Sequence, residues 1–198
     1  LKAVLEEVFS SVDMIGKIFA IEGCGSVGGH FGRLIAEAGG TIVCADLREG
    51  AASALADETG GTLVSPEEIS KVDCDVYCPC ALGGSLNEDT IPHLKARAVA
   101  GCANNQLADP DRHGRMLGKR GILYAPDYVI NAGGLINIFN EIGREYDEAR
   151  SLKMMEQINF NLKEIFRIAR EEDLPTALAA DRFAERRLRS AERAGARA

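Results

Sequence analysis

A glycine-rich loop between two apolar runs places the strongest constraint on the fold of this chain. Gly23, Gly25 and Gly28 form a Gly-x-Gly-x-x-Gly pattern that directly follows the apolar residues 18–21, and the next apolar run ends at Asp46. In a strand–loop–helix unit, the first glycine permits a tight turn and the second lets the backbone approach a pyrophosphate. The third glycine allows the helix to pack closely on the strand. The order of these features predicts a dinucleotide-binding unit whose phosphates lie at a helix N-terminus.

Short apolar runs alternate with amphipathic helical patterns along most of the chain. Alternation of this kind predicts an α/β fold in which crossover connections join a mainly parallel sheet. We expect a doubly wound Rossmann sheet with strand order 3-2-1-4-5-6, in which ligands bind beyond the carboxyl ends of the strands. The expected strands are residues 18–21, 41–45, 62–64, 76–78, 98–100 and 122–124, and the expected helices are residues 1–9, 27–38, 49–58 and one capped by Ser65 with Pro66 at its first position.

The strand pattern ends at Asn131, and helical patterns fill the rest of the chain. Residues 148–171 have the length and period of one long helix, and a last helix is expected over residues 177–193. We therefore divide the chain into a Rossmann domain with a leading helix, residues 1–146, and C-terminal helices that pack back on it, residues 147–198.

Composition excludes several classes of partner. The 198-residue chain has a formal net charge of −7, so we expect no nucleic-acid partner, which would need a basic surface. No apolar run approaches the roughly 18 residues that cross a bilayer, so we expect no membrane partner. The spacing of Cys74, Cys78 and Cys80 is not that of a zinc site, and no histidine lies nearby. We expect reduced thiols in the cytoplasm and no bound metal.

Three loops at the expected strand ends have unusual compositions. Residues 78–84 are small and apolar, so that a ribose or a flat ring can approach the backbone closely. Residues 101–106 include three consecutive amide side chains, from Asn104 to Gln106, which suit a carboxamide or a ribose hydroxyl. A turn or helix cap made by one of the asparagines explains the same residues equally well. Residues 131–134 again combine an amide with a backbone poor in side chains.

At these loops the chain resembles the family of glutamate, leucine, phenylalanine and valine dehydrogenases, and within it the leucine dehydrogenases most. The matching segments are spread over nearly the whole chain and occur in the family's order, and one of them is long and specific. They are residues 23–28, 79–83, 103–107, 111–114, 125–134 and 179–182.

The resemblance implies an NAD-dependent enzyme that oxidatively deaminates a branched-chain or related L-amino acid to the 2-oxo acid and ammonia. Position by position, it assigns the adenine ribose hydroxyls to Asp46 and the nicotinamide and substrate side of the cleft to Asn131. A carboxylate at Asp46 also repels a 2′-phosphate and so favours NAD over NADP, although Arg48 softens that repulsion. The resemblance assigns the pyrophosphate to Gly23, Cys24, Gly25, Ser26, Val27 and Gly28, and the nicotinamide ribose region to Cys80, Ala81 and Asn104.

The resemblance places the catalytic lysine and aspartate in an N-terminal domain that would precede Leu1. None of the seven lysines present lies in a matching motif, so we expect no catalytic residue in this chain. The expected partners are that N-terminal catalytic domain, the amino acid substrate and further copies of the chain in a homo-oligomer. The missing neighbour would leave apolar cleft surface exposed, which predicts self-association or poor solubility.

Two questions stay open at this point. The identity of the amino acid is not determined, because the pocket determinants lie mostly in the absent domain. The second candidate function is a non-catalytic NAD-binding or redox-sensing module. Such a module would need the glycine loop and Asp46, but it has no evident use for amides at the nicotinamide end of the cleft.

Overall fold

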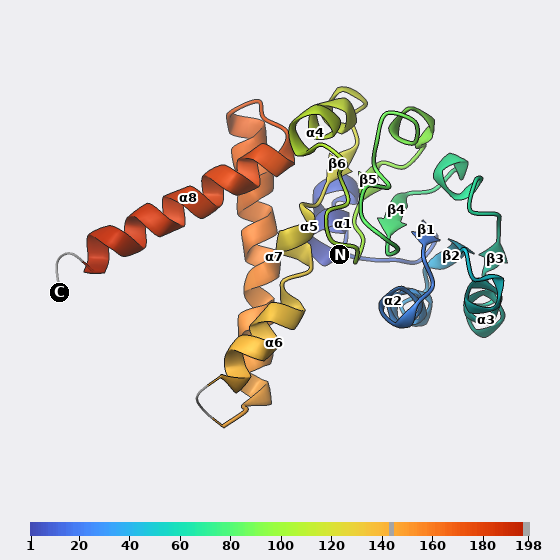
Figure 1. The fold of residues 1–198 in the computed structure, drawn as a ribbon, viewed down its shortest axis with the longest axis horizontal. Coiled ribbons are helices and arrows are strands. Elements are labelled where there is room, and N and C mark those ends of the chain that lie inside the picture. Colours follow the sequence, from blue (N-terminus) through green and yellow to red (C-terminus); the bar gives the residue numbers. More distant parts are fainter. Residues whose placement is uncertain (143–144, 196–198) are drawn as a thin grey trace.

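The computed structural model describes residues 1–142 and 145–195 of the chain. Within these residues, six parallel strands form one sheet in the order β3-β2-β1-β4-β5-β6, which confirms the predicted order (Figure 1). The strands are β1 (Ile18–Glu22), β2 (Thr41–Ala45), β3 (Thr62–Leu63), β4 (Val76–Pro79), β5 (Ala98–Val99) and β6 (Leu123–Tyr124). The strand order reverses where the chain leaves β3 and crosses to β4. The carboxyl ends of β1 and β4 therefore form the switch point at which such sheets bind ligands.

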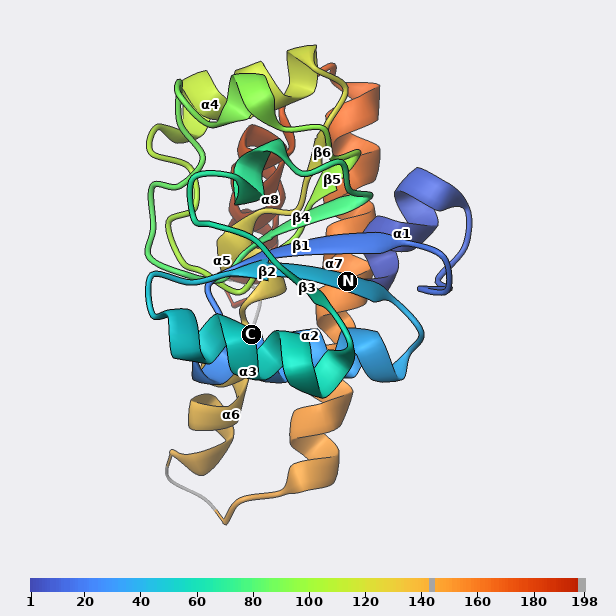
Figure 2. The same ribbon diagram turned by 90° about the vertical axis from the view of Figure 1, so that its right-hand side faces the viewer.

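Helices cover both faces of the sheet. The described helices are α1 (Lys2–Phe9), α2 (Ser26–Glu37), α3 (Glu49–Thr59), α4 (Pro110–Lys119), α5 (Asp127–Ile130), α6 (Gly133–Glu141), α7 (Glu148–Glu171) and α8 (Thr176–Gly195), with short 3-10 helices η1 (Ile69–Lys71) and η2 (Ile91–His93). Figure 2 shows α2 and α3 side by side on one face of the sheet and α4 on the opposite face. The helix expected at residues 1–9 is present as α1, which packs against α7.

The central strand separates two apolar cores, because successive side chains of a strand point to opposite faces of the sheet. Phe19 and Ile21 are buried in the core that also contains Phe166 of α7. Ala20 is buried in the other core, together with Tyr77 of β4. Burial on both faces explains why the sheet strands read as short continuous apolar runs in the sequence.

Two local expectations were wrong. No α-helix follows Ser65: the segment makes a turn and then η1, and the Lys71 and Val72 amides donate to carbonyls three residues earlier. This connection has to cross β2 and β1 to reach β4, which leaves few residues for regular helix. Residues 131–134, expected as a loop, do not form one either. Gly133 begins α6, directly after the short helix α5.

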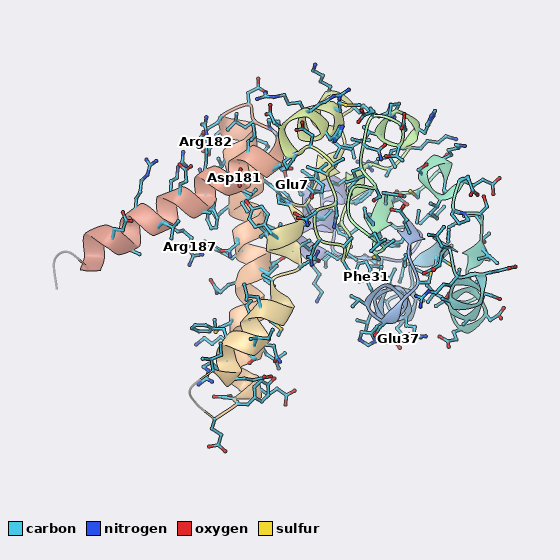
Figure 3. All side chains as sticks on the ribbon, in the orientation of Figure 1. Glu7, Phe31, Glu37, Asp181, Arg182 and Arg187 are labelled. Carbon is cyan, nitrogen blue, oxygen red and sulfur yellow. The ribbon has the colours of Figure 1, made fainter. Side chains whose placement is uncertain are left out.

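The C-terminal helices flank the β6 edge of the sheet. The long helix expected over residues 148–171 is confirmed as α7, which packs against α1, α5, α6 and α8. The first turns of α8 pack against α7 through Ala179 and Ala180. The rest of α8 leads away from the sheet and exposes Arg182 and Arg187 (Figures 1 and 3). None of the described helices is both long enough and apolar enough to cross a membrane.

Gly101 tests the tight packing between the ends of β4 and β5. A Cβ at this position would lie 2.1 Å from the Pro79 carbonyl oxygen, so Gly101→Ala should lower the free energy of unfolding by about 2 kcal/mol or more. A Cβ on Gly118 of α4 would meet no atom within 4 Å, so Gly118→Ala should raise stability by about 0.5–1 kcal/mol through helix propensity. Urea unfolding of both variants measures the contrast. Equal stability of the two variants would contradict the packing described.

Candidate dinucleotide-binding site

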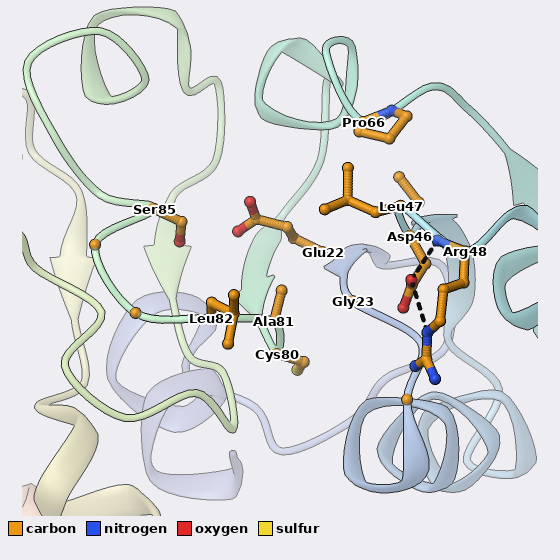
Figure 4. Close-up of a pocket in the computed structure, with 14 residues that line it drawn as sticks. Glu22, Gly23, Asp46, Leu47, Arg48, Pro66, Cys80, Ala81, Leu82 and Ser85 are labelled. Carbon is orange, nitrogen blue, oxygen red and sulfur yellow. Dashed lines mark hydrogen bonds and ion pairs between the residues drawn. The ribbon is translucent and has the colours of Figure 1, made fainter.

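A cleft of about 590 Å³ opens at the carboxyl ends of β1, β2 and β4, at the predicted switch point (Figure 4). Its floor is formed by Gly23 and Gly25 of the glycine loop. Asp46 closes one side, and Cys80 and Ala81 of the loop after β4 close another. The structure therefore brings together residues that the sequence placed in three separate loops. These loops meet because parallel strands end at the same edge of the sheet.

The glycine loop leaves no space for side chains. Gly23 has φ +97°, and a Cβ on it would lie 2.6 Å from the Ala81 nitrogen. A Cβ on Gly28 would lie 2.0 Å from the Gly23 carbonyl oxygen. Any side chain at either position would force the loop away from β4 or the helix away from β1. The two glycines thus hold the loop close against its neighbours and leave the cleft above it open.

The N-terminus of α2 faces this loop. Gly25 is the N-cap residue and supplies no side-chain cap to the helix. Ser26 and Val27 occupy the first turn and are exposed. The first-turn amides of a helix have no partner within the helix, and the helix dipole adds positive potential there. This arrangement suits an anionic group such as a pyrophosphate.

Asp46 ties the end of β2 to the glycine loop. Its Oδ2 accepts a 2.7 Å hydrogen bond from the Cys24 amide, and its Oδ1 accepts a 2.8 Å bond from the Arg48 amide. The Arg48 Nε lies 3.5 Å from the same Oδ1 (Figure 4). Burial opposes ionisation, but these amides and the guanidinium outweigh it and hold the pKa of Asp46 below its usual value. The side chain is a carboxylate at neutral pH.

The residues expected at the nicotinamide end lie beside this cleft rather than all inside it. Cys80 and Ala81 line it, whereas Asn104 is exposed on the loop after β5. Asn131 donates from Nδ2 to the Ala103 carbonyl oxygen at 2.8 Å. The Asn131 side chain therefore links the turn after α5 to the loop after β5, and its carbonyl oxygen is the part left for other partners.

The loop after β5 is braced from within by a buried amide. Gln106 donates from Nε2 to the carbonyl oxygens of Gly101 at 3.0 Å and Ala103 at 2.9 Å. The Gln106 backbone amide donates to Asp127 Oδ2 at 3.2 Å, which attaches α5 to the same loop. Asn105 adopts φ +52°, so the turn interpretation holds for this asparagine. The three consecutive amides thus have different roles.

Several cleft residues escaped the sequence reasoning. They are Leu47, Glu22 and Ser85, which line the cleft together with Leu82 of the loop over residues 78–84 (Figure 4). Leu47 and Leu82 have 88% and 85% of their surface exposed. Leu47 directly follows Asp46, and Glu22 directly precedes Gly23, so adjacency to the motif was the available signal. Ser85 had no such signal, because its position depends on the course of the loop after β4.

Two pairs of thiols lie beside the cleft. The Cys24 thiol donates to the Ala45 carbonyl oxygen at 3.5 Å, and the neighbouring Cys44 thiol together with burial raises the pKa of Cys24. The neighbouring Cys102 thiol together with burial likewise raises the pKa of the Cys80 thiol. Cys24 and Cys80 therefore stay protonated, and protonated thiols are poor nucleophiles and poor metal ligands. Among the described residues, no group of three histidine, cysteine or acidic side chains is placed to hold a metal ion.

Asp46→Asn should reveal how much the carboxylate stabilises the loop. At pH 7 the variant should lose about 1–2 kcal/mol of unfolding free energy, because two amide donors then face a neutral group. The lowered pKa means that this stabilisation is fully present above the usual pKa of 3.8 and is lost as pH falls through the native value. Urea unfolding at pH 7 and at about pH 3.5 should therefore show a difference between wild type and variant that shrinks with acidity.

Asp57→Asn is the matched control for this measurement. Asp57 is an exposed residue of α3, and its side chain makes none of the hydrogen bonds and ion pairs found among the described residues. The same loss of charge there should change stability by less than about 0.5 kcal/mol. An Asp46→Asn variant that behaved like this control would show that the carboxylate does not hold the loop.

Comparison with known proteins gives a consistent result. Residues 45–194 match the family model described as Glutamate/Leucine/Phenylalanine/Valine dehydrogenase. The chain is 43% identical over 194 residues to a leucine dehydrogenase of Geobacillus stearothermophilus, which covers 98% of this chain and 52% of that protein. It is 43% identical over 199 residues to an L-tryptophan dehydrogenase of Nostoc punctiforme, which covers 100% of this chain and 56% of that protein.

A solved structure supports the same assignment. The crystal structure of L-tryptophan dehydrogenase from Nostoc punctiforme superposes with a TM-score of 0.92 at 44% sequence identity, over 96% of this chain and 57% of that chain. The chain spans about half the length of the curated relatives that it matches. From the matched residues and the shared fold, the chain belongs to the glutamate/leucine/phenylalanine/valine dehydrogenase family.

Proposed function

We propose that this chain is the NAD-binding half of an amino acid dehydrogenase. The observation that carries the proposal is the glycine cradle beside Asp46. Gly23 and Gly28 let the loop lie closer to its neighbours than a Cβ would allow, and the Asp46 carboxylate stands at the end of β2, where a ribose would lie. Family membership supports the same reaction class, since the relatives compared are leucine and L-tryptophan dehydrogenases.

The residues present suit a dinucleotide. The first turn of α2, with Ser26 and Val27, would hold the pyrophosphate, and Asp46 would accept hydrogen bonds from the adenine ribose hydroxyls. Cys80, Ala81 and Asn104 would border the nicotinamide ribose. A bound nicotinamide ring would supply the hydride acceptor for the oxidation of an amino acid. The chain's contribution is to bind and orient the dinucleotide.

Substrate binding would be shared with an N-terminal half. We propose that residues 1–146 form the cofactor domain, that residues 147–198 pack back on it, and that Asn131 faces an L-amino acid across the cleft. The deamination also needs a base or an ammonium beside the substrate carbon, and we place the lysine and aspartate that serve there in the N-terminal half. A reducing cytoplasm suits the free thiols of this chain.

The helices beyond the sheet offer a surface for assembly. α6 and the start of α7 extend past the body of the molecule (Figure 1), and Leu135, Ile138 and Ile142 are exposed by 71%, 55% and 67%. Exposed apolar side chains at this density mark contact surfaces. We propose that they are covered in a homo-oligomer of the whole enzyme, and that the isolated chain self-associates.

Calorimetric titration tests the cofactor. Wild type should bind NAD saturably and bind NADP at least about tenfold more weakly, because a 2′-phosphate would lie against the Asp46 carboxylate. Asp46→Asn should reduce that preference to within about threefold, whereas Asp57→Asn should leave it unchanged. If spectroscopy shows that the chain is folded and it still binds neither dinucleotide, the proposal is contradicted.

Turnover tests the division of labour. The isolated chain should oxidise no leucine, phenylalanine or tryptophan with NAD, because we place the lysine and aspartate that act at the substrate carbon in the N-terminal half. Adding the N-terminal half, in one chain or as a separate chain, should produce NADH from one of these amino acids. Turnover by the pure isolated chain would refute the division, and NAD binding without turnover by the completed protein would favour a sensing module instead.

A further inference from the structure

Two buried polar groups in the cleft have no partner. Glu22 Oε2 and the Ser85 hydroxyl are shielded from solvent, and neither makes a hydrogen bond within the described residues. Both residues line the same cleft (Figure 4). A buried polar atom without a hydrogen bond costs free energy, and the cost is larger for a charged group. Two such atoms facing one cleft indicate a ligand that supplies the missing bonds.

The fold fixes the direction of the Glu22 side chain. Glu22 is the last residue of β1 and, by strand alternation, points to the same face of the sheet as Ala20. Tyr77 lies on that face too. Burial and the adjacent Glu22 carboxylate raise the pKa of Tyr77, so its hydroxyl stays protonated and can donate a hydrogen bond to Glu22. Glu22 Oε2 itself has no hydrogen-bond partner among the described residues.

The surroundings suit a flat aromatic base. Leu47 and Leu82 are highly exposed on opposite loops, after β2 and after β4, and Pro66 adds a further apolar surface. A planar ring lying between these loops would cover side chains that water now contacts. Asp46 stands in the same cleft, so a base attached to the ribose at Asp46 would reach this position.

We propose that Glu22 and Ser85 recognise the amino edge of the adenine ring. This inference rests on the proposed function, since it assumes that a dinucleotide binds with its adenosine in this cleft. Adenine carries an exocyclic amine, which donates, next to ring nitrogens, which accept. Glu22 Oε2 accepts from the amine, and the Ser85 hydroxyl donates to an adjacent ring nitrogen. One edge of the adenine ring would thus supply hydrogen-bond partners for both Glu22 Oε2 and the Ser85 hydroxyl.

The proposal predicts discrimination between two purines. Hypoxanthine replaces the amine of adenine with a carbonyl oxygen, which would face the Glu22 carboxylate as a second acceptor. Such a mismatch leaves the buried carboxylate oxygen unpaired and adds repulsion. A correct pair of base-edge hydrogen bonds discriminates by about one order of magnitude or more.

The test is calorimetric titration with NAD and with nicotinamide hypoxanthine dinucleotide, which differ only at this edge. Wild type should bind NAD about tenfold more tightly or better. Glu22→Gln should bring the two affinities to within about twofold, because the new amide can turn its donor toward the carbonyl. Ser85→Ala should weaken NAD by about threefold, for the loss of one neutral hydrogen bond.

Glu37→Gln is the control for the change of charge. Glu37 is exposed at the end of α2 (Figure 3), and the substitution should leave the ratio of the two affinities at the wild-type value. Equal binding of both dinucleotides by wild type would overturn the inference even if Glu22→Gln failed to fold. An unchanged ratio in a folded Glu22→Gln variant would overturn it as well. No binding of NAD by wild type would instead overturn the proposed function.

Discussion

The close approach of the glycine loop to the loop after β4 is the constraint on which the cleft depends. At Gly23 and Gly28, the absence of a side chain lets backbone meet backbone at distances that a Cβ would forbid. Asp46 then fixes the loop from β2 through the Cys24 amide. The amides at the start of α2 and the Asp46 carboxylate thus lie on one small surface, with positive potential beside negative charge. A ligand with phosphates and ribose hydroxyls in sequence matches that surface.

Much of the fold could be predicted because it depends on local signals that agree with one another. The strand order follows from the alternation of strands and helices, and α7 follows from a long helical period that begins after the N-cap residue Asp147. The prediction of a helix after Ser65 was wrong because the serine and proline there are typical of helix starts, whereas the segment forms a turn and η1. The connection there has to run from β3 across β2 and β1 to β4, and this distance is set by the strand order, which no local sequence pattern reveals.

The candidate site also has a part that the sequence predicts and a part that it does not. The glycine loop and Asp46 belong to one continuous strand–loop–helix–strand unit, so their spacing in the sequence predicts that they lie close together. Glu22 and Ser85 come from β1 and from the loop after β4, and only the parallel pairing of these strands brings them into one cleft. Gln106 was expected among residues suited to a ligand, yet the structure uses its amide to brace the loop after β5. Composition could not separate these roles, because the same amide serves either.

A crystal structure of this chain grown with NAD would be the sharpest test of the cleft as a dinucleotide site. We expect density for the pyrophosphate at the first turn of α2, ribose hydroxyls within hydrogen-bonding distance of Asp46, and the adenine between Leu47 and Leu82. NAD bound with its phosphates elsewhere, or with Asp46 turned away from the ribose, would contradict this assignment of the cleft.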